Sequence, residues 1–182
     1  LKSLGARGRG TLFMTLLALV KVLLYRYTGQ RDLLVGSPVS GRVRSEFESQ
    51  VGLYVNTVVL RDKLRRDEGF DALLGRVRET TLQALEHQAY PFDLIVDEVA
   101  APRDPGRNPL FDVLVVTETE QPEVLEWSLP GVAVAGVPFA YDESKFDLTF
   151  SFAERQNSLM LNVEYRTDLF DRSRVERMVQ HL

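Results

Sequence analysis

The sequence predicts a single α/β domain of about six strands and four helices. Short runs of β-branched residues alternate along the chain with longer segments whose apolar residues recur at helical spacing. The composition, 45% hydrophobic and 26% charged, is that of an ordinary globular protein. A length of 182 residues suffices for one domain with a sizeable core, and we find no internal repeat or low-complexity tract.

The helices are predicted from their apolar faces and from residues that begin or end helices. The run Leu12–Leu24 is apolar on most of its surface, and Thr28 and Gly29 follow it as a stop signal. Pro91 suits the first turn of a helix, because its missing N–H has no partner there. The predicted helices are Thr11–Tyr27, Gly69–Glu86, Phe92–Val99 and Phe170–Leu182, the last of them capped near Asp171.

The strands are predicted from short runs of β-branched and aromatic residues. Val51–Arg61 is the clearest, since apolar residues on both faces are typical of a buried strand. Leu33–Gly36 is predicted to be a short strand that ends in a sharply bent loop at Ser37–Arg42. One helical turn is expected within Ser45–Gln50. The remaining strands are expected at Phe111–Val116, Val132–Val134, Phe146–Phe152 and Leu159–Tyr165.

Composition and charge exclude several classes of function. The net charge is −4, the pI is about 5.3 and no basic stripe is visible, which argues against a nucleic-acid partner. The absence of Cys excludes a disulfide framework, a thiolate metal site and a Cys nucleophile, and it fits a cytoplasmic location. The apolar run near the start is shorter than the roughly 20 residues that span a bilayer, so no membrane is expected. The first residue, Leu1, suggests a segment of a longer chain.

Residues with catalytic chemistry are scarce. The only histidines are His87 and His181, and neither has a partner carboxylate that the sequence identifies. No Ser nucleophile motif and no phosphate-binding Gly-rich loop occurs. The residues alone therefore describe a globular unit without a self-contained catalytic or metal site.

Asn56 and Thr57 are the exception, because they place polar side chains in the middle of a predicted buried strand. A buried Asn must find hydrogen-bond partners or cost a few kcal/mol. One interpretation is that Asn56 satisfies neighbouring backbone groups, and the other is that the strand presents it to a cleft. Spacing alone does not decide between the two.

Five segments in order carry a family resemblance. They resemble the later signature motifs of condensation domains from nonribosomal peptide synthetases, and together they span most of the chain. The segments are Gly36–Arg42, Val51–Thr57 with Arg61, His87–Asp93, Arg103–Phe111 and Ser144–Thr149. The resemblance implies the C-terminal lobe of a two-lobed fold similar to chloramphenicol acetyltransferase, with helices packed on a mixed sheet.

The resemblance also implies an activity for the parent domain. Condensation domains form an amide bond between a donor acyl group and an acceptor aminoacyl group, each held as a thioester on the phosphopantetheine of a peptidyl carrier protein. Their catalytic motif, His-His-x-x-x-Asp-Gly, belongs to the N-terminal lobe, and no adjacent His pair occurs in this sequence. This lobe would supply a tunnel wall and a carrier-docking surface, with the missing N-terminal lobe as its other partner.

Site residues follow from the motifs, and none of them is expected to be catalytic or to bind a metal. Arg42 is the candidate, ahead of Arg61, for pairing with the Asp of the missing catalytic motif. Ala89 and Gly106 depart from the residues that the family often carries. The expected tunnel or structural residues are Arg42, Asn56, Thr57, His87, Gln88, Pro91, Arg103, Arg107 and Asn108.

Other functions within the superfamily are weighed against this one. A non-catalytic condensation-like module would recruit carrier proteins or tailoring enzymes, and the sequence upstream of Leu1 would distinguish it. An acyltransferase acting on soluble thioesters is disfavoured, because the matches are to condensation motifs. The run Arg107–Leu110 favours condensation over epimerization. Heterocyclization domains differ chiefly in the lobe that is absent, and they are therefore disfavoured.

Overall fold

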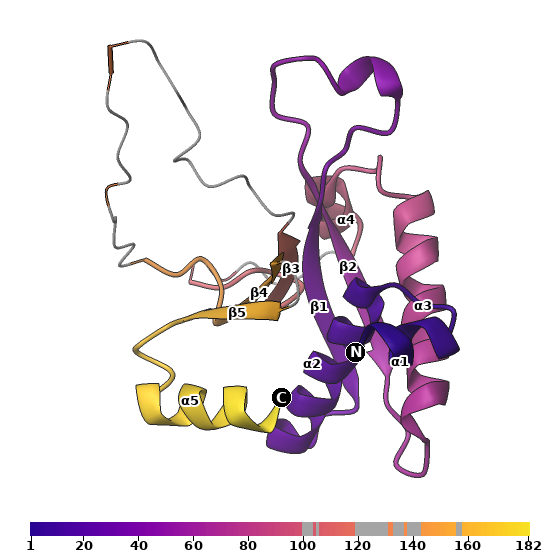
Figure 1. Cartoon of the computed structure of the whole chain (residues 1–182), viewed down its shortest axis with the longest axis vertical. Coiled ribbons are helices and arrows are strands. Elements are labelled where there is room, and N and C mark those ends of the chain that lie inside the picture. Colours follow the sequence, from indigo (N-terminus) through magenta and orange to yellow (C-terminus); the bar gives the residue numbers. More distant parts are fainter. Residues whose placement is uncertain (100–103, 105, 119–130, 133–136, 138–142, 156–157) are drawn as a thin grey trace.

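The fold is a mixed β-sheet covered by helices. The computed structural model describes residues 1–99, 104, 106–118, 131–132, 137, 143–155 and 158–182. In this part of the chain, five strands form one sheet in the order β2-β1-β3-β4-β5 (Figure 1). β1–β2 and β4–β5 are antiparallel, whereas β1–β3 and β3–β4 are parallel. The strands are β1 Asp32–Val39, β2 Asn56–Lys63, β3 Val113–Glu118, β4 Leu148–Arg155 and β5 Ser158–Tyr165.

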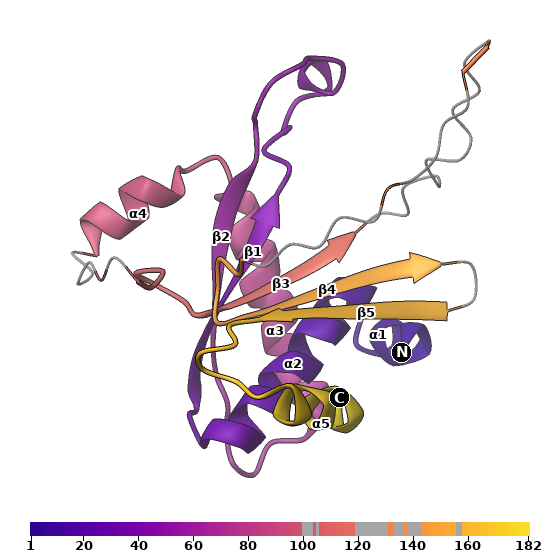
Figure 2. The same ribbon diagram turned by 90° about the vertical axis from the view of Figure 1, so that its left-hand side faces the viewer.

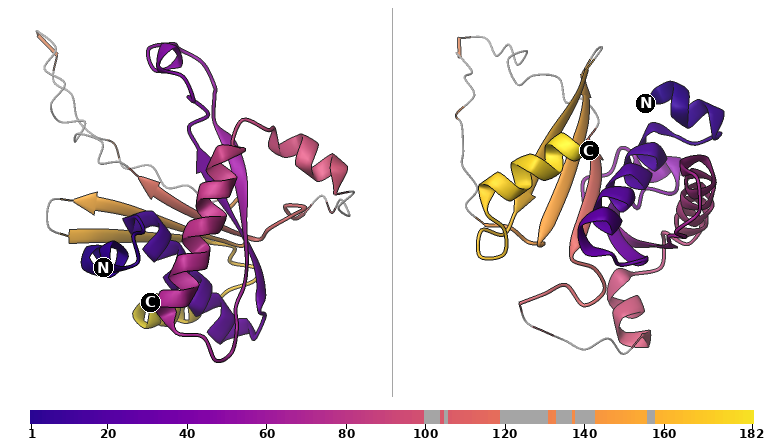
Figure 3. Two further views of the ribbon diagram at one scale, coloured as in Figure 1. Left: turned by 90° about the vertical axis from the view of Figure 1, so that its right-hand side faces the viewer. Right: turned by 90° about the horizontal axis from the view of Figure 1, so that it is seen from below.

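Helices α2 and α3 pack beside each other on one face of the sheet, and α5 lies near the end of α2 (Figure 3). Leu17, Val35 and Phe150 are fully buried between these layers. The predicted α/β class is therefore confirmed. The helices in the described residues are α1 Lys2–Arg7, α2 Leu12–Thr28, α3 Phe70–Glu86, α4 Phe92–Glu98, α5 Arg172–His181 and a 3-10 turn at Ser45–Phe47.

The boundaries of α2 show why helices were the more predictable elements. The Thr11 hydroxyl accepts a hydrogen bond from the backbone N–H of Met14 at 3.2 Å. Gly29 ends the helix with a φ of 72°, in the left-handed region that favours glycine. All four predicted helices are confirmed to within two residues at each end.

Helix α1 was not predicted, because a Gly-rich segment has low helix propensity. It nevertheless packs against α2, where Gly5 is fitted to the contact. A Cβ at Gly5 would lie 2.7 Å from the Thr15 side-chain oxygen. Tertiary contact therefore stabilises a helix that local preference does not.

Strand β1 is longer than predicted, since Ser37–Val39 continue it instead of bending away. Pro38 pairs with Thr57 of β2, but β1 and β3 pair only at Val35–Val113 and Gly36–Leu114. Proline cannot donate to a strand ladder, and at Pro38 no β3 partner requires it to do so. Strands β1 and β3 diverge beyond Gly36 (Figure 2).

The predicted strand Val51–Arg61 is confirmed from Asn56 onward and is wrong for Val51–Val55, because β2 begins only at Asn56. Val51 is 104% exposed and Leu53 91% exposed. These residues belong to the loop between β1 and β2, which stands clear of the sheet in Figures 1 and 2. Pairing with β1 stops at Val39–Asn56, so the alternating residues before it have no neighbouring strand.

The other predicted strands shift by a few residues to become β3, β4 and β5. The strand expected at Val132–Val134 lies, beyond Val132, outside the described residues. None of the described helices is both long and apolar enough to cross a membrane.

A buried ion pair connects α2, β2 and α3. Lys21 is fully buried, and its ammonium donates to the Asp62 carboxylate and, at 2.9 Å, to the Leu60 carbonyl. The Thr80 hydroxyl donates to the other Asp62 oxygen at 2.8 Å. Burial lowers the pKa of Lys21, and the Asp62 carboxylate opposes that shift. The pair is stable only because both charges have partners.

We expect Asp62→Ala to lower the free energy of unfolding of the complete domain by about 3–5 kcal/mol, because the Lys21 ammonium would remain buried without its partner. Glu154→Ala is the control, since Glu154 pairs with Lys2 on the surface and should cost less than about 1 kcal/mol. Urea unfolding measures both. Equal losses would contradict a structural role for the buried pair.

Candidate functional site

Asn56, at the start of β2, fixes the turn between α3 and α4. Its side-chain amide donates to the carbonyls of Gln88 at 2.8 Å and Tyr90 at 2.7 Å. Its side-chain oxygen accepts from the backbone N–H of Phe92 at 3.1 Å. Three backbone groups are thereby satisfied by one side chain, which is the first of the two interpretations of Asn56.

His87 and Pro91 contribute to this turn through their backbone groups. His87 is the C-cap residue of α3. Its backbone N–H donates to the Gln83 carbonyl at 3.3 Å, and its side chain is exposed. Pro91 is the N-cap residue of α4, and its carbonyl accepts from the backbone N–H groups of Leu94 and Ile95. Thr57 lies half-buried in β2 opposite Pro38.

Asn108 shapes the loop that leads into β3. Its side-chain oxygen accepts from the backbone N–H groups of Leu110 at 3.1 Å and Phe111 at 3.2 Å. Such a side-chain turn replaces backbone bonding just where Pro109 supplies no N–H. The turn directs Phe111 into the protein, where it is 4% exposed.

Four motif segments meet around Phe111. Its ring stacks on Phe146 with centroids 5.3 Å apart and meets Phe92 edge-on at 5.8 Å. Gly36 of β1 lies against the same ring, and a Cβ at that position would be 2.2 Å from it. We name this cluster of Gly36, Phe92, Phe111 and Phe146 the Phe111 junction.

Sequence reasoning did not single out the three aromatic residues of the Phe111 junction. A signal was present, because each is followed by Asp in a different motif: Phe92-Asp93, Phe111-Asp112 and Phe146-Asp147. In two of these pairs the Phe turns inward while the Asp enters a surface network of charges.

This network holds the loop before β3. Arg107 donates to both oxygens of Asp112, at 3.1 and 2.6 Å. Arg166 donates to both oxygens of Asp168, at 3.1 and 2.7 Å, and to the Gly106 carbonyl at 2.9 Å. The Asp112 carboxylate raises the pKa of Arg107. Arg107 is therefore already engaged by a partner within this chain. Arg166 was not anticipated from the sequence.

Asp147 is the partly buried member of the network. Burial raises its pKa, the Asp112 carboxylate adds to the rise, and Arg166, whose guanidinium lies 3.6 Å away, opposes it.

The predicted site residue Arg103 lies outside the described residues.

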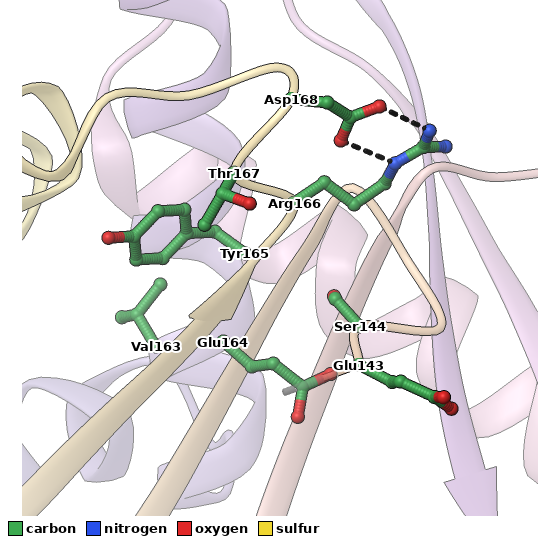
Figure 4. A pocket seen from close by; sticks show the side chains of 8 residues that line it. All are labelled: Glu143, Ser144, Val163, Glu164, Tyr165, Arg166, Thr167 and Asp168. Carbon is green, nitrogen blue, oxygen red and sulfur yellow. Dashed lines mark hydrogen bonds and ion pairs between the residues drawn. The ribbon is translucent and has the colours of Figure 1, made fainter. Parts of the chain in front are cut away.

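Beside Arg166 a cavity of about 600 Å³ opens between the C-terminal end of β5 and the segment that precedes β4 (Figure 4). None of the site residues predicted from the motifs lines it. The lining residues are Glu143, Ser144, Val163, Glu164, Tyr165, Arg166, Thr167 and Asp168. Its carboxylates are mostly exposed, and Figure 4 shows Arg166 already paired with Asp168.

Arg42 is held within its own loop. Its guanidinium donates to the carbonyl of Phe47 and, at 3.3 Å, to that of Gly52, and it lies 4.5 Å from the centre of the Tyr54 ring. Arg61 is engaged elsewhere, donating to both oxygens of Asp32 at 2.9 and 2.7 Å.

The two histidines lie at the C-terminal ends of helices α3 and α5. His87 is exposed at the end of α3, and His181 shares a hydrogen bond of 2.8 Å with the Tyr27 hydroxyl. No group of three or more His, Cys, Asp or Glu that could hold a metal ion occurs in the described part of the chain. The arrangement can shape and position, and its polar groups mainly satisfy one another.

A family model for the condensation domain matches residues 2–182. The chain belongs to the condensation-domain family. A linear gramicidin synthase of Brevibacillus parabrevis is 46% identical to it over 185 residues, and tyrocidine synthase 2 of the same organism is 41% identical over 181. Each match covers the whole of this chain but only 4% and 5% of those proteins, respectively.

Solved structures show the same fold. A four-domain nonribosomal peptide synthetase bound to AMP and glycine is similar with a TM-score of 0.84 and 25% identity, over 98% of this chain and 14% of that one. The X-domain from teicoplanin biosynthesis gives a TM-score of 0.85 at 22% identity, over 97% of this chain and 40% of that one. The fold of this chain therefore occurs within longer solved chains.

We expect Asn56→Ala to lower the stability of the complete domain by roughly 1–3 kcal/mol, because it leaves the Gln88, Tyr90 and Phe92 backbone groups without their partner. Asn162→Ala on β5 is the control, since that side chain is exposed and should change stability little. Thermal unfolding and turnover are measured together. An unchanged melting temperature with collapsed turnover would show that Asn56 acts on the reaction first.

Proposed function

We propose that this chain is the C-terminal lobe of a nonribosomal peptide synthetase condensation domain that forms amide bonds. Its substrates would be a donor acyl and an acceptor aminoacyl group, both thioesters on the phosphopantetheine of peptidyl carrier proteins. The observation that carries the proposal is the convergence of the family's motif segments at Asn56 and the Phe111 junction. The names of the related synthases, gramicidin and tyrocidine, support the substrate class.

In this reaction the acceptor amine attacks the donor thioester carbonyl. The new C–N bond forms, the C–S bond breaks, and the proton lost by the amine balances the thiolate that leaves. A histidine of the other lobe would orient the amine or accept its proton. The contribution of this lobe is to fix one wall against which the two thioesters meet, which makes their encounter effectively intramolecular.

The residues of this lobe fit a positioning role. Asn56 and Asn108 bond to backbone, Arg107 pairs with Asp112, and Arg166 fastens the loop that contains Gly106. Each interaction holds one motif segment against another. The proposal places the domain in the cytoplasm, in keeping with a sequence that has no Cys.

A second candidate is a non-catalytic condensation-like module that recruits carrier proteins or a tailoring enzyme. The specific observation in its favour is a similarity, with a TM-score of 0.87 at 23% identity, to the X-domain in a complex with OxyB from teicoplanin biosynthesis. That similarity concerns the fold alone. The two candidates differ in whether the other lobe has an intact His-His-x-x-x-Asp-Gly motif.

We expect this chain alone to form no peptide product from donor- and acceptor-loaded carrier proteins, because it has no His pair. The complete domain is the positive control and should form product. Product from the isolated chain above the uncatalysed rate would contradict the proposal. A complete domain that forms none, yet binds a tailoring enzyme, would favour the second candidate.

Arg42 is proposed to pair with the Asp of the catalytic motif in the other lobe. A carboxylate buried between lobes needs a partner, and a guanidinium can donate to both of its oxygens. Since Arg42 also holds its own loop, a single substitution would destabilise the domain whether or not the pairing exists. Only the coupling energy between Arg42 and the Asp of the motif, measured with the double variant, distinguishes a pairing between lobes from a role within the loop alone.

We therefore expect Arg42→Ala and the Asp→Ala change in the motif each to lower the free energy of unfolding by about 3–5 kcal/mol, the usual effect of breaking a buried pair. The double variant should lose less than the sum of the two single losses. The free energy of unfolding of the complete domain is the measurement. Arg61→Ala is the matched control and should be additive with the Asp change, since Arg61 pairs with Asp32. If the losses caused by Arg42→Ala and the Asp change were also additive, Arg42 would not pair with the Asp of the other lobe.

A further inference from the structure

A cavity of about 200 Å³ lies where strands β1 and β3 separate. The two strands pair only at Val35–Val113 and Gly36–Leu114, and Figure 2 shows their tips pointing apart. Helices α2 and α3 contribute to its wall, so the space lies between the sheet and the helices that cover it. We name it the β1–β3 cavity, and residues that line it include Phe13, Ser37, Val58, Thr81, Leu85 and Thr117.

The β1–β3 cavity runs from the surface to an apolar interior. Leu85 and Thr117 are exposed at its mouth, whereas Leu60 is fully buried and Val58 is 7% exposed. In another protein, an apolar cavity of about 150 Å³ binds a benzene molecule. The β1–β3 cavity therefore has room for one short aliphatic side chain.

One buried polar group faces this cavity without a partner. The Ser37 side chain is 5% exposed, and it makes no hydrogen bond to another residue that the structure describes. By contrast, the buried Thr81 hydroxyl donates to the Val77 carbonyl at 2.6 Å. A buried hydroxyl that lacks a partner is unfavourable, so Ser37 is available to a polar atom of a ligand. The N–H and carbonyl groups beside the side chain of an aminoacyl thioester are such atoms.

The β1–β3 cavity adjoins two of the motif segments. Ser37–Val39 line it and belong to the segment Gly36–Arg42. Pro38 pairs across the sheet with Thr57, and Val58 follows Thr57 directly in β2. A thioester held against this proposed tunnel wall would therefore have the mouth of the cavity within reach of its side chain.

We propose that the β1–β3 cavity receives the aliphatic side chain of one of the two thioester substrates and thereby sets substrate preference. This inference rests on the proposed function. One methylene more or less in a hydrophobic pocket changes the rate of reaction about 10–200-fold. The donor and the acceptor offer the same side-chain chemistry, so the experiment varies each of them in turn.

The test measures single-turnover amide formation by the complete condensation domain. One carrier protein is loaded with leucine or alanine while the other holds glycine, and the two loadings are then exchanged. On one of the two carriers, we expect leucine to react at least about tenfold faster than alanine in the parent domain. Val58→Phe fills the cavity and should bring the two rates to within about twofold of each other.

Val113→Phe is the matched control, because Val113 is a half-buried strand valine that lines a different cavity at the start of β1. It should retain the preference for leucine even if both rates fall. Leu85→Trp, at the exposed mouth, is a second variant for the case in which Val58→Phe does not fold, and it should also remove the preference. A parent without a preference on either carrier, or a preference that survives a folded cavity variant, would overturn the inference.

A parent domain that forms no product contradicts the proposed function instead. The cavity is then tested by calorimetry with leucyl and alanyl pantetheine amides, which bind without reacting. Tighter binding of the leucyl compound that Val58→Phe abolishes would support the cavity as a side-chain site. Equal binding of the two compounds to the parent would overturn it.

Discussion

The contact between Gly36 and Phe111 is the constraint around which the lobe is organised. A Cβ at Gly36 would lie 2.2 Å from the Phe111 ring, so only glycine admits that ring beneath β1. Phe146 and Phe92 then pack on the same ring. Segments from β1, α4 and the entries to β3 and β4 are thereby fixed relative to one another.

Polar side chains extend this arrangement in three places. The buried Lys21–Asp62 pair joins α2 to β2, Asn56 joins β2 to the turn before α4, and Arg166 joins the end of β5 to the loop before β3. In each case the partners are far apart in the sequence, and in the buried Lys21–Asp62 pair a desolvated charge would be unpaired if one side were removed. The motif residues therefore act mainly by holding a shape, in keeping with the proposed role in positioning substrates.

Local features of the sequence predicted the helices, whereas tertiary contacts determined what it could not predict. Thr11 and Gly29 mark the ends of α2 without reference to the rest of the chain. By contrast, Lys21 has its partner 41 residues away, so it read only as an interruption of an apolar run. The alternation at Val51–Val55 resembles a buried strand, yet none of the strands that the structure describes pairs with it.

The candidate site was predictable to the extent that motif order encodes contacts. The segments containing Asn56 and Phe92 were identified from the sequence, and the structure joins them by a hydrogen bond between residues 36 positions apart. The role of Arg166 could not be predicted, since its bond to the Gly106 carbonyl spans 60 residues and involves a backbone group that every residue carries.

The central claim is that this lobe positions substrates while the ionising catalytic group lies in the other lobe. The pH dependence of single-turnover amide formation by the complete domain tests it, with Phe111→Leu compared to the parent. The account predicts a slower reaction with an unchanged apparent pKa, because loosening the Phe111 junction alters alignment and leaves the titrating group in place. A shifted or abolished pKa would place the titrating group under the control of this lobe and contradict the account.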